Sequence, residues 1–302
     1  MTYFKTITLA AAAVLTIHTV AQEPTAKLGK YRGWGDRDLA FNSQTQLTCD
    51  KNFYNLNLLQ SKPNKKGQTN TVFHLSAPRQ QWNFGRAPIN FLSMRVNGIS
   101  LSSLEPQAEH VTTWKKGDRA GVRYALNFDG AKIFMDAAVK KGSPLLFLTF
   151  SQPEKQLEPI QKPVQINFSA VVSRLLTRKG VTIWDGVYGR QAQSAARLIT
   201  QQKAPVKLTP ADKYLVLSDS ILDGTGKGNA KGVGPCLIAF DLKDGMTGTL
   251  KMPNSWITHI EFQLPPNFKE FKSAVFMQKN IICNAEFMKR FNAEKTAFTS
   301  LD

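Results

Sequence analysis

The sequence has no apolar run long enough to cross a membrane. Its longest apolar stretch, Ile7–Ile17, spans 11 residues and includes two threonines. A membrane-spanning helix needs about 20 consecutive apolar residues, and no later segment comes near that length. We therefore expect no membrane span in the chain that follows this stretch.

Cysteine is scarce, and its number is odd. The chain contains Cys49, Cys236 and Cys283, so at least one thiol stays unpaired even in an oxidising compartment. Cys236 and Cys283 lie in apolar, strand-like segments, which favours buried and unreactive thiols; one disulfide is the alternative. A nucleophilic cysteine needs a polar neighbourhood with a base, and the flanking residues offer none.

Motifs for nucleotides and calcium are also missing. The glycine-rich stretch 223–234 leads into a strand-like segment, whereas a phosphate-binding loop ends in Lys-Ser/Thr and opens a helix. A loop between two strands is the prediction, and an anion-facing flap carrying Lys227 and Lys231 is the alternative.

Asp219 and Asp223 lack the spacing of an EF-hand loop, which favours turn and capping roles over a calcium site.

Paired metal ligands and paired catalytic carboxylates do not occur in any familiar pattern. His74, His110 and His259 are far apart, so the sequence predicts no metal site and no cofactor. It contains no Gly-x-Ser-x-Gly motif of a nucleophilic serine. Glycoside hydrolysis commonly needs two carboxylates across the scissile bond. The nearest acidic groupings are Asp36 with Asp38 and Asp129 with Asp136.

The N-terminal residues of the chain have the pattern of an export signal. Lys5 supplies a positive charge, Ile7–Ile17 the apolar segment, and Thr19 and Ala21 the small residues before a cleavage site. We predict cleavage after Ala21. No lipobox is present, because the first cysteine is Cys49. The mature protein is therefore expected to be secreted or periplasmic.

The chain is strongly basic. It carries 39 Lys and Arg against 22 Asp and Glu, and loss of residues 1–21 removes Lys5 alone, leaving 38 against 22 and a charge of +16. The positive charges are dispersed, which is typical of a basic surface and not of a charged tail. Such a surface attracts polyanions. Outside the cytoplasm we expect these to be acidic glycans or lipids and not a specific nucleic acid; a generally basic proteome is the alternative explanation.

Alternating apolar and polar residues predict an all-β fold. Val122–Phe128 and Ala131–Val139 alternate on either side of Asp129-Gly130, a strong β-hairpin signal. Many such runs with few helices indicate a large antiparallel β-sandwich, of two-sheet or supersandwich type. The other predicted strands are 37–49, 52–59, 71–77, 89–97, 143–151, 164–170, 181–184, 213–218, 236–241, 247–252, 256–264 and 272–277.

One C-terminal helix is predicted over Asn284–Phe298, with Phe287, Met288, Phe291 and Lys295 on one stripe. The resulting division of the chain has three parts. Residues 1–21 form the signal peptide, residues 22–36 an irregular lead-in, and residues 37–302 one β-sandwich domain. The alternative is two lobes divided near 152–162, where the sequence is rich in polar residues and proline.

His259 and Glu261 are the catalytic candidates. They stand two residues apart on the strand predicted for 256–264, so both side chains point to the same face. A histidine base oriented by a carboxylate needs such proximity. An ordinary solvated strand face has the same pattern, and that interpretation stays open.

Three loops combine an aromatic residue with glycine, arginine and a polar neighbour. Tryptophan and tyrosine can stack on the apolar faces of sugar rings, while aspartate and arginine bind hydroxyl and acidic groups. Tryptophan that closes the edge of a sandwich core is the other interpretation of each loop. The predicted ligand-binding residues are Trp34, Asp36, Arg37, Trp82, Arg86, Trp184, Asp185, Tyr188 and Arg190.

These observations favour a secreted or periplasmic β-sandwich that binds carbohydrate, with an acidic glycan as the expected ligand. The alternatives are a glycoside hydrolase or polysaccharide lyase on the same scaffold, and a structural or interaction protein of the cell envelope.

Overall fold

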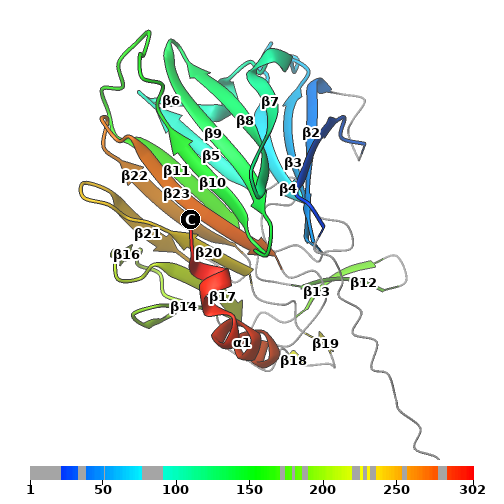
Figure 1. Ribbon diagram of the computed structural model, residues 1–302. Coiled ribbons are helices and arrows are strands. Elements are labelled where there is room, and N and C mark those ends of the chain that lie inside the picture. The colour runs from blue at the N-terminus through cyan, green and yellow to red at the C-terminus, as the bar shows by residue number, and fades with distance from the viewer. Residues whose placement is uncertain are drawn as a thin grey trace, which may run out of the picture.

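The computed structural model shows two stacked antiparallel sheets (Figure 1). The signal peptide predicted for residues 1–21 lies outside the described residues. The structure describes residues 22–32, 39–50, 52–76, 91–170, 174–178, 181–185, 190–219, 225–226, 230–231, 236–253, 257–277 and 284–302.

Sheet I has ten strands, and all its pairings are antiparallel. β6 (Ile99–Ser100) pairs with β5 off the main path. The main path runs in the order β1 (Thr25–Gly29), β2 (Leu39–Cys49), β3 (Asn52–Ser61), β4 (Thr71–Ser76), β5 (Leu92–Val96), β11 (Val164–Ala170), β22 (Thr258–Leu264), β21 (Thr247–Lys251) and β16 (Val206–Leu208).

Sheet II has nine strands and is antiparallel as well. Its order is β15 (Leu198–Thr200), β14 (Arg190–Ser194), β17 (Tyr214–Asp219), β20 (Cys236–Phe240), β23 (Glu270–Met277), β10 (Leu146–Ser151), β9 (Ala131–Lys140), β8 (Arg119–Phe128) and β7 (Val111–Lys116). Two small ribbons pair β12 (Arg174–Arg178) with β13 (Val181–Asp185) and β18 (Thr225–Gly226) with β19 (Ala230–Lys231).

The predicted all-β sandwich is confirmed. Each sheet contains strands from both sides of the segment 152–162, which connects β10 of sheet II to β11 of sheet I. Two short 3-10 turns, Leu101–Ser103 and Ala108–His110, stand between β6 and β7.

The core lies between the two sheets and is rich in aromatic rings. Phe262 of β22 packs against Phe168 of β11 in the same sheet, at 6.1 Å between ring centroids. It also packs against two rings of sheet II, Phe271 at 4.9 Å and Phe240 at 5.2 Å. Burial of this apolar surface is the main force that holds the sheets together.

A second, smaller core forms where the C-terminal helix covers the outer face of sheet II (Figure 1). The predicted helix is present but divided at Glu294 into α1 (Asn284–Ala293) and α2 (Lys295–Thr299). Phe287 and Phe291 are buried as predicted. Lys295 is exposed, and its ammonium lies 5.7 Å from the ring centroid of Tyr214, the ring that Phe291 also contacts. Beyond the break, Phe298 is buried as well.

The prediction of an irregular lead-in over residues 22–36 was also wrong in part. β1 pairs with β2 along its whole length, from Thr25 opposite Thr48 to Gly29 opposite Gln44. This edge strand buries little: Ala26 packs partly against the core, and Leu28 is half exposed. The alternation in β1 is limited to two apolar residues, Ala26 and Leu28, which is too short a run to mark a strand in the sequence.

Cys49 and Cys236 are buried, as expected for unreactive thiols, and Cys283 lies outside the described residues. Burial raises the pKa of Cys49 to about 12, and the neighbouring carboxylate of Asp50 adds to the effect. The thiolate form is therefore disfavoured at neutral pH. Among the described helices, none is long and apolar enough to span a membrane.

Candidate functional site

The outer face of sheet I is polar where β11 and β22 run side by side. Along β22, Ile260 and Phe262 point into the core, whereas His259 and Glu261 alternate with them and stay partly exposed. β11 has the same alternation, with Asn167 on the outer face. The pleat of the strands therefore collects polar side chains on one surface.

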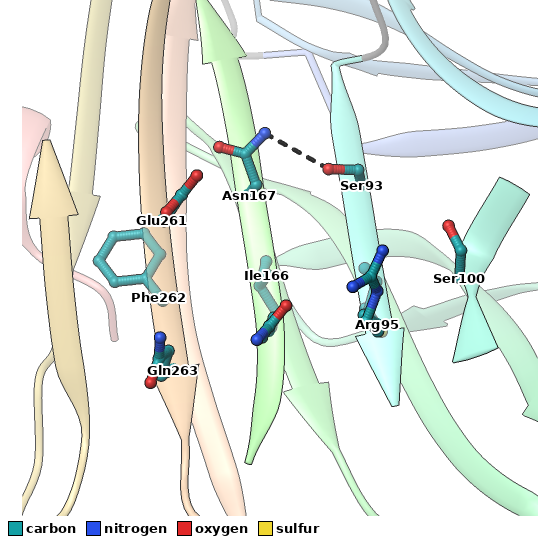
Figure 2. A pocket seen from close by; sticks show the side chains of 10 residues that line it. Ser93, Arg95, Ser100, Ile166, Asn167, Glu261, Phe262 and Gln263 are labelled. Carbon is teal, nitrogen blue, oxygen red and sulfur yellow. Dashed lines mark hydrogen bonds between the residues drawn. The ribbon is translucent and has the colours of Figure 1, made fainter. Parts of the chain in front are cut away.

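A cavity of about 280 Å³ opens on this face. Figure 2 shows Asn167 near its centre, between Glu261 of β22 and Ser93 of β5. The cavity is lined by Ser93, Met94, Arg95, Ser100, Gln165, Ile166, Asn167, Glu261, Phe262 and Gln263.

Asn167 has one amide atom satisfied and one without a partner. Its Nδ2 donates to the hydroxyl oxygens of Ser93 at 3.3 Å and Ser169 at 3.4 Å. Its Oδ1 is buried and accepts no hydrogen bond. An unsatisfied buried acceptor costs about 1–3 kcal/mol.

At one end of the cavity, two amides and a guanidinium stand in a row. Gln165 lies opposite Arg95 on one side and opposite Gln263 on the other, and all three side chains are exposed. Amides both donate and accept hydrogen bonds, and the guanidinium offers a planar fork that matches a carboxylate or sulfate.

At the other end, Glu261 forms an ion pair with Lys251 of β21, with 2.6 Å between Oε2 and Nζ. Both side chains are more than a third exposed, so the pair contributes little to stability. Glu261 lines the cavity, and Lys251 lies beside it outside the lining.

His259 stands beside this ion pair. Its Nδ1 lies 3.1 Å from the hydroxyl oxygen of Ser169. Burial lowers the pKa of His259, Glu261 acts in the opposite direction, and Lys251 adds to the lowering. The net lowering favours the neutral imidazole, which can accept a hydrogen bond.

Polar side chains continue along the same face onto β2, β3 and β4. Gln44 Nε2 donates to Asn57 Oδ1 at 2.8 Å, and Asn57 lies opposite His74. Burial lowers the pKa of His74. The Oδ1 atom of Asn55 is buried without a partner, like that of Asn167. Among the described residues, the outer face of sheet I thus carries two unsatisfied acceptors, on β3 and β11.

The sequence-predicted catalytic candidates lie on one face, as expected from their spacing. Each has another partner, because His259 contacts Ser169 and Glu261 pairs with Lys251. Of the described residues that line the cavity, Glu261 is the acidic one. A catalytic role for the two residues stays a prediction.

The predicted ligand-binding loops lie mostly outside the described residues, and their role stays a prediction too. Trp184 and Asp185 belong to β13, opposite Leu175 and Arg174 of β12, and Arg190 begins β14. Those outside the description are Trp34, Asp36, Arg37, Trp82, Arg86 and Tyr188.

Of the acidic residues considered from sequence for glycoside hydrolysis, the structure describes Asp129 and Asp136. Asp136 pairs with Arg123 at 2.7 Å, and Asp129 occupies the turn between β8 and β9. In the described ranges, no three His, Cys, Asp or Glu side chains gather where they could hold a metal ion. Asp36, Asp38, Asp223 and Lys227 lie outside the description.

Sequence reasoning missed Asn167, Ser93 and Arg95 as site residues. The alternation over 164–170 places Asn167 on a polar face, which was visible in the sequence. The pairing of β11 with β5 and β22 was not, because these strands are distant along the chain.

Comparison with known proteins yields similarity to solved structures alone. No family model matches the chain, and no curated protein does. A Klebsiella pneumoniae protein, provisionally described as an aldose 1-epimerase, aligns at 8% identity and a TM-score of 0.41, covering 93% of this chain and 90% of that one.

Two α-galactosidase structures align over a smaller share of their length. For the GH36 enzyme AgaB of Geobacillus stearothermophilus, the identity is 6% and the TM-score 0.38, with 78% of this chain and 40% of that chain covered. For the galactosidase domain of AgaSK, an α-galactosidase-sucrose kinase, the identity is 6% and the TM-score 0.35, with 75% of this chain and 39% of that chain covered. The chain thus spans about two-fifths of these enzymes.

Proposed function

We propose that the protein is a secreted or periplasmic carbohydrate-binding β-sandwich whose ligand is an acidic glycan, bound on the outer face of sheet I. The observation that carries this proposal is the buried, unsatisfied Oδ1 of Asn167 inside a cavity lined by amides and hydroxyls. Sugar hydroxyls are donors as well as acceptors, so one of them can satisfy this atom while others engage neighbouring amides.

The basic groups at the site favour an acidic sugar. Arg95 is exposed at one end of the cavity, where its fork can bind a uronate carboxylate or a sulfate in bidentate fashion. At the other end, Lys251 offsets the charge of Glu261. The large positive charge of the chain acts in the same direction, by raising the local concentration of anionic glycans.

A carbohydrate-active enzyme on the same face is the second candidate, favoured by the neutral imidazole of His259 beside Glu261. In a lyase, a base removes the proton at C5 of a uronate, the C5–H electrons form a C4–C5 double bond, and the C4–O bond breaks. The departing oxygen takes the electrons of that bond and picks up a proton to become a hydroxyl group of the released sugar. Ultraviolet absorbance of the unsaturated product, measured after incubation with uronate polymers, distinguishes this activity from binding alone.

Replacing Asn167 by alanine is expected to weaken glycan binding about tenfold, because one buried hydrogen bond to the ligand is lost. The mature protein is first screened on a glycan array to find the ligand. The dissociation constants of wild type and variant are then measured by isothermal titration calorimetry.

The matched control is Asn292→Ala, which removes an exposed amide on α1 and is expected to leave the affinity unchanged. Equal affinities of wild type and Asn167→Ala would contradict the proposed site. An array without any bound glycan would contradict the function. Binding to every polyanion that vanishes as the salt concentration rises would reduce it to nonspecific charge attraction.

A further inference from the structure

The outer face of sheet II carries a second cavity, on the part of the sheet formed by β7 to β10. Its volume is about 590 Å³. We call this surface the Trp114 platform. It is lined by Thr112, Trp114, Lys115, Lys116, Arg123, Asp136 and Thr149.

The tryptophan ring is seated directly on the backbone of the neighbouring strand. Trp114 lies opposite Gly121, and a Cβ atom at Gly121 would stand 2.6 Å from Cζ2 of the indole. The absence of a side chain at Gly121 therefore makes room for the ring. The indole Nε1 is buried and has no acceptor, so packing holds the ring in place.

Beside the ring, Arg123 presents a fixed guanidinium group. Its Nε and Nη2 donate to both carboxylate oxygens of Asp136, at 2.7–3.2 Å. The guanidinium also lies 5.0 Å from the ring centroid of Phe134. The Arg123 side chain nevertheless stays 48% exposed, so it is oriented by the protein and open to a ligand.

The surroundings of the platform are basic. Lys115 and Lys116 are exposed, and Arg119 lies over the Phe147 ring at 5.0 Å. The charge of Asp136 is offset by Arg123, and the nearby Glu23 is shared between Lys115 and Lys141. A positive excess remains around an aromatic ring.

From this combination we infer a second binding site, for a sulfated or uronate-bearing oligosaccharide. An aromatic ring can stack on a sugar, and the neighbouring lysines can bind its acidic groups. The exposed part of the Arg123 guanidinium can donate a further hydrogen bond to the sugar. A single-stranded nucleic acid would also match a basic aromatic surface. The export signal predicted in the sequence favours a glycan, because it places the protein outside the cytoplasm.

This inference rests on the proposed function, since both sites would take acidic glycan. The two sites lie on the outer faces of opposite sheets, so one protein molecule can bind two glycan segments at once. Such bivalency raises avidity for a polymer without any new contact.

The test is isothermal titration calorimetry with a heparin-derived hexasaccharide as the probe. Wild type is expected to bind two molecules. Trp114→Ala and Lys116→Gln are each expected to weaken one of the two events about tenfold or more and to leave the other unchanged. Asn167→Ala is expected to weaken the binding event at the sheet I cavity. Lys66→Gln, which changes an exposed lysine of the β3–β4 turn, is the control and is expected to weaken neither event.

Thermal melts of all variants show whether each is folded, and Lys116→Gln keeps the test valid if Trp114→Ala unfolds. One bound molecule whose affinity depends on Asn167 and not on the platform would overturn the inference while leaving the proposed function standing. No binding of this probe by wild type would overturn the inference, whereas the proposed function is overturned by an array without any bound glycan. If the platform bound single-stranded oligonucleotides as tightly as it binds the hexasaccharide, its assignment to glycans would be overturned.

Discussion

Replacing Phe262 by alanine is expected to lower the free energy of unfolding by about 4 kcal/mol, the largest effect of any single change considered. The ring is fully buried and touches aromatic rings of both sheets, Phe168 in sheet I and Phe240 and Phe271 in sheet II. Its removal loses transfer free energy and leaves a cavity that strands cannot close, because their hydrogen bonds fix their spacing.

Urea denaturation of wild type and variant measures this loss. Phe262→Leu, which keeps most of the volume, is expected to cost about 1.5 kcal/mol. Phe53→Ala is a second control, since Phe53 of β3 is only partly buried, and it is expected to cost less than Phe262→Ala. A loss below about 1 kcal/mol for Phe262→Ala would mean that this ring does not join the sheets.

Replacing Asp212 by alanine is expected to cost about 3 kcal/mol, because it removes a buried carboxylate around which two loops are organised. Asp212 is 0% exposed. Its oxygens accept hydrogen bonds from the Ser194 hydroxyl, from Nε and Nη2 of Arg197, and from the backbone and hydroxyl of Thr209. Without the carboxylate, these donors lose their acceptor.

Because of Asp212, the free energy of unfolding is also expected to depend on pH. Burial alone would raise the pKa of Asp212, but the hydrogen bonds from Thr209, Ser194 and Arg197 outweigh it, and the pKa lies below its ordinary value of 3.8. The carboxylate therefore stabilises the fold fully above pH 3.8, and this contribution is lost as the pH falls through the lower pKa of the folded state.

Urea denaturation at pH 7 and in steps below pH 3.8 measures both effects. The difference between wild type and Asp212→Ala is expected to be largest at pH 7 and to shrink in acid. Asp244→Ala, at an exposed carboxylate, is expected to change stability by less than about 0.5 kcal/mol. A difference that grew in acid would show that Asp212 is not held as a carboxylate by its donors.

Local signals explain which parts of the fold were predictable. Asp129 and Gly130 have φ angles of 53° and 88°, the left-handed region that a two-residue hairpin turn requires and that Asp-Gly readily adopts. The predicted hairpin is therefore present as β8 and β9. Apolar alternation likewise marked β11 and β22, because each buries one face against the core.

The candidate site was predictable only in part. The two-residue spacing placed His259 and Glu261 on one face, but neighbours in the sheet decide what surrounds them. Asn167 and Ser93 join the site because β11 lies between β22 and β5, and this order results from long-range packing that no local pattern records. The Trp114 platform was missed for a similar reason: the role of Gly121 becomes visible only once β7 and β8 are paired.

The measurement that tests the central claim most directly is a crystal structure of the mature protein with the acidic glycan selected on the array. We expect a sugar hydroxyl to donate a hydrogen bond to Oδ1 of Asn167, with an acidic group of the glycan at Arg95. A bound glycan that leaves this cavity empty and contacts neither residue would contradict the account.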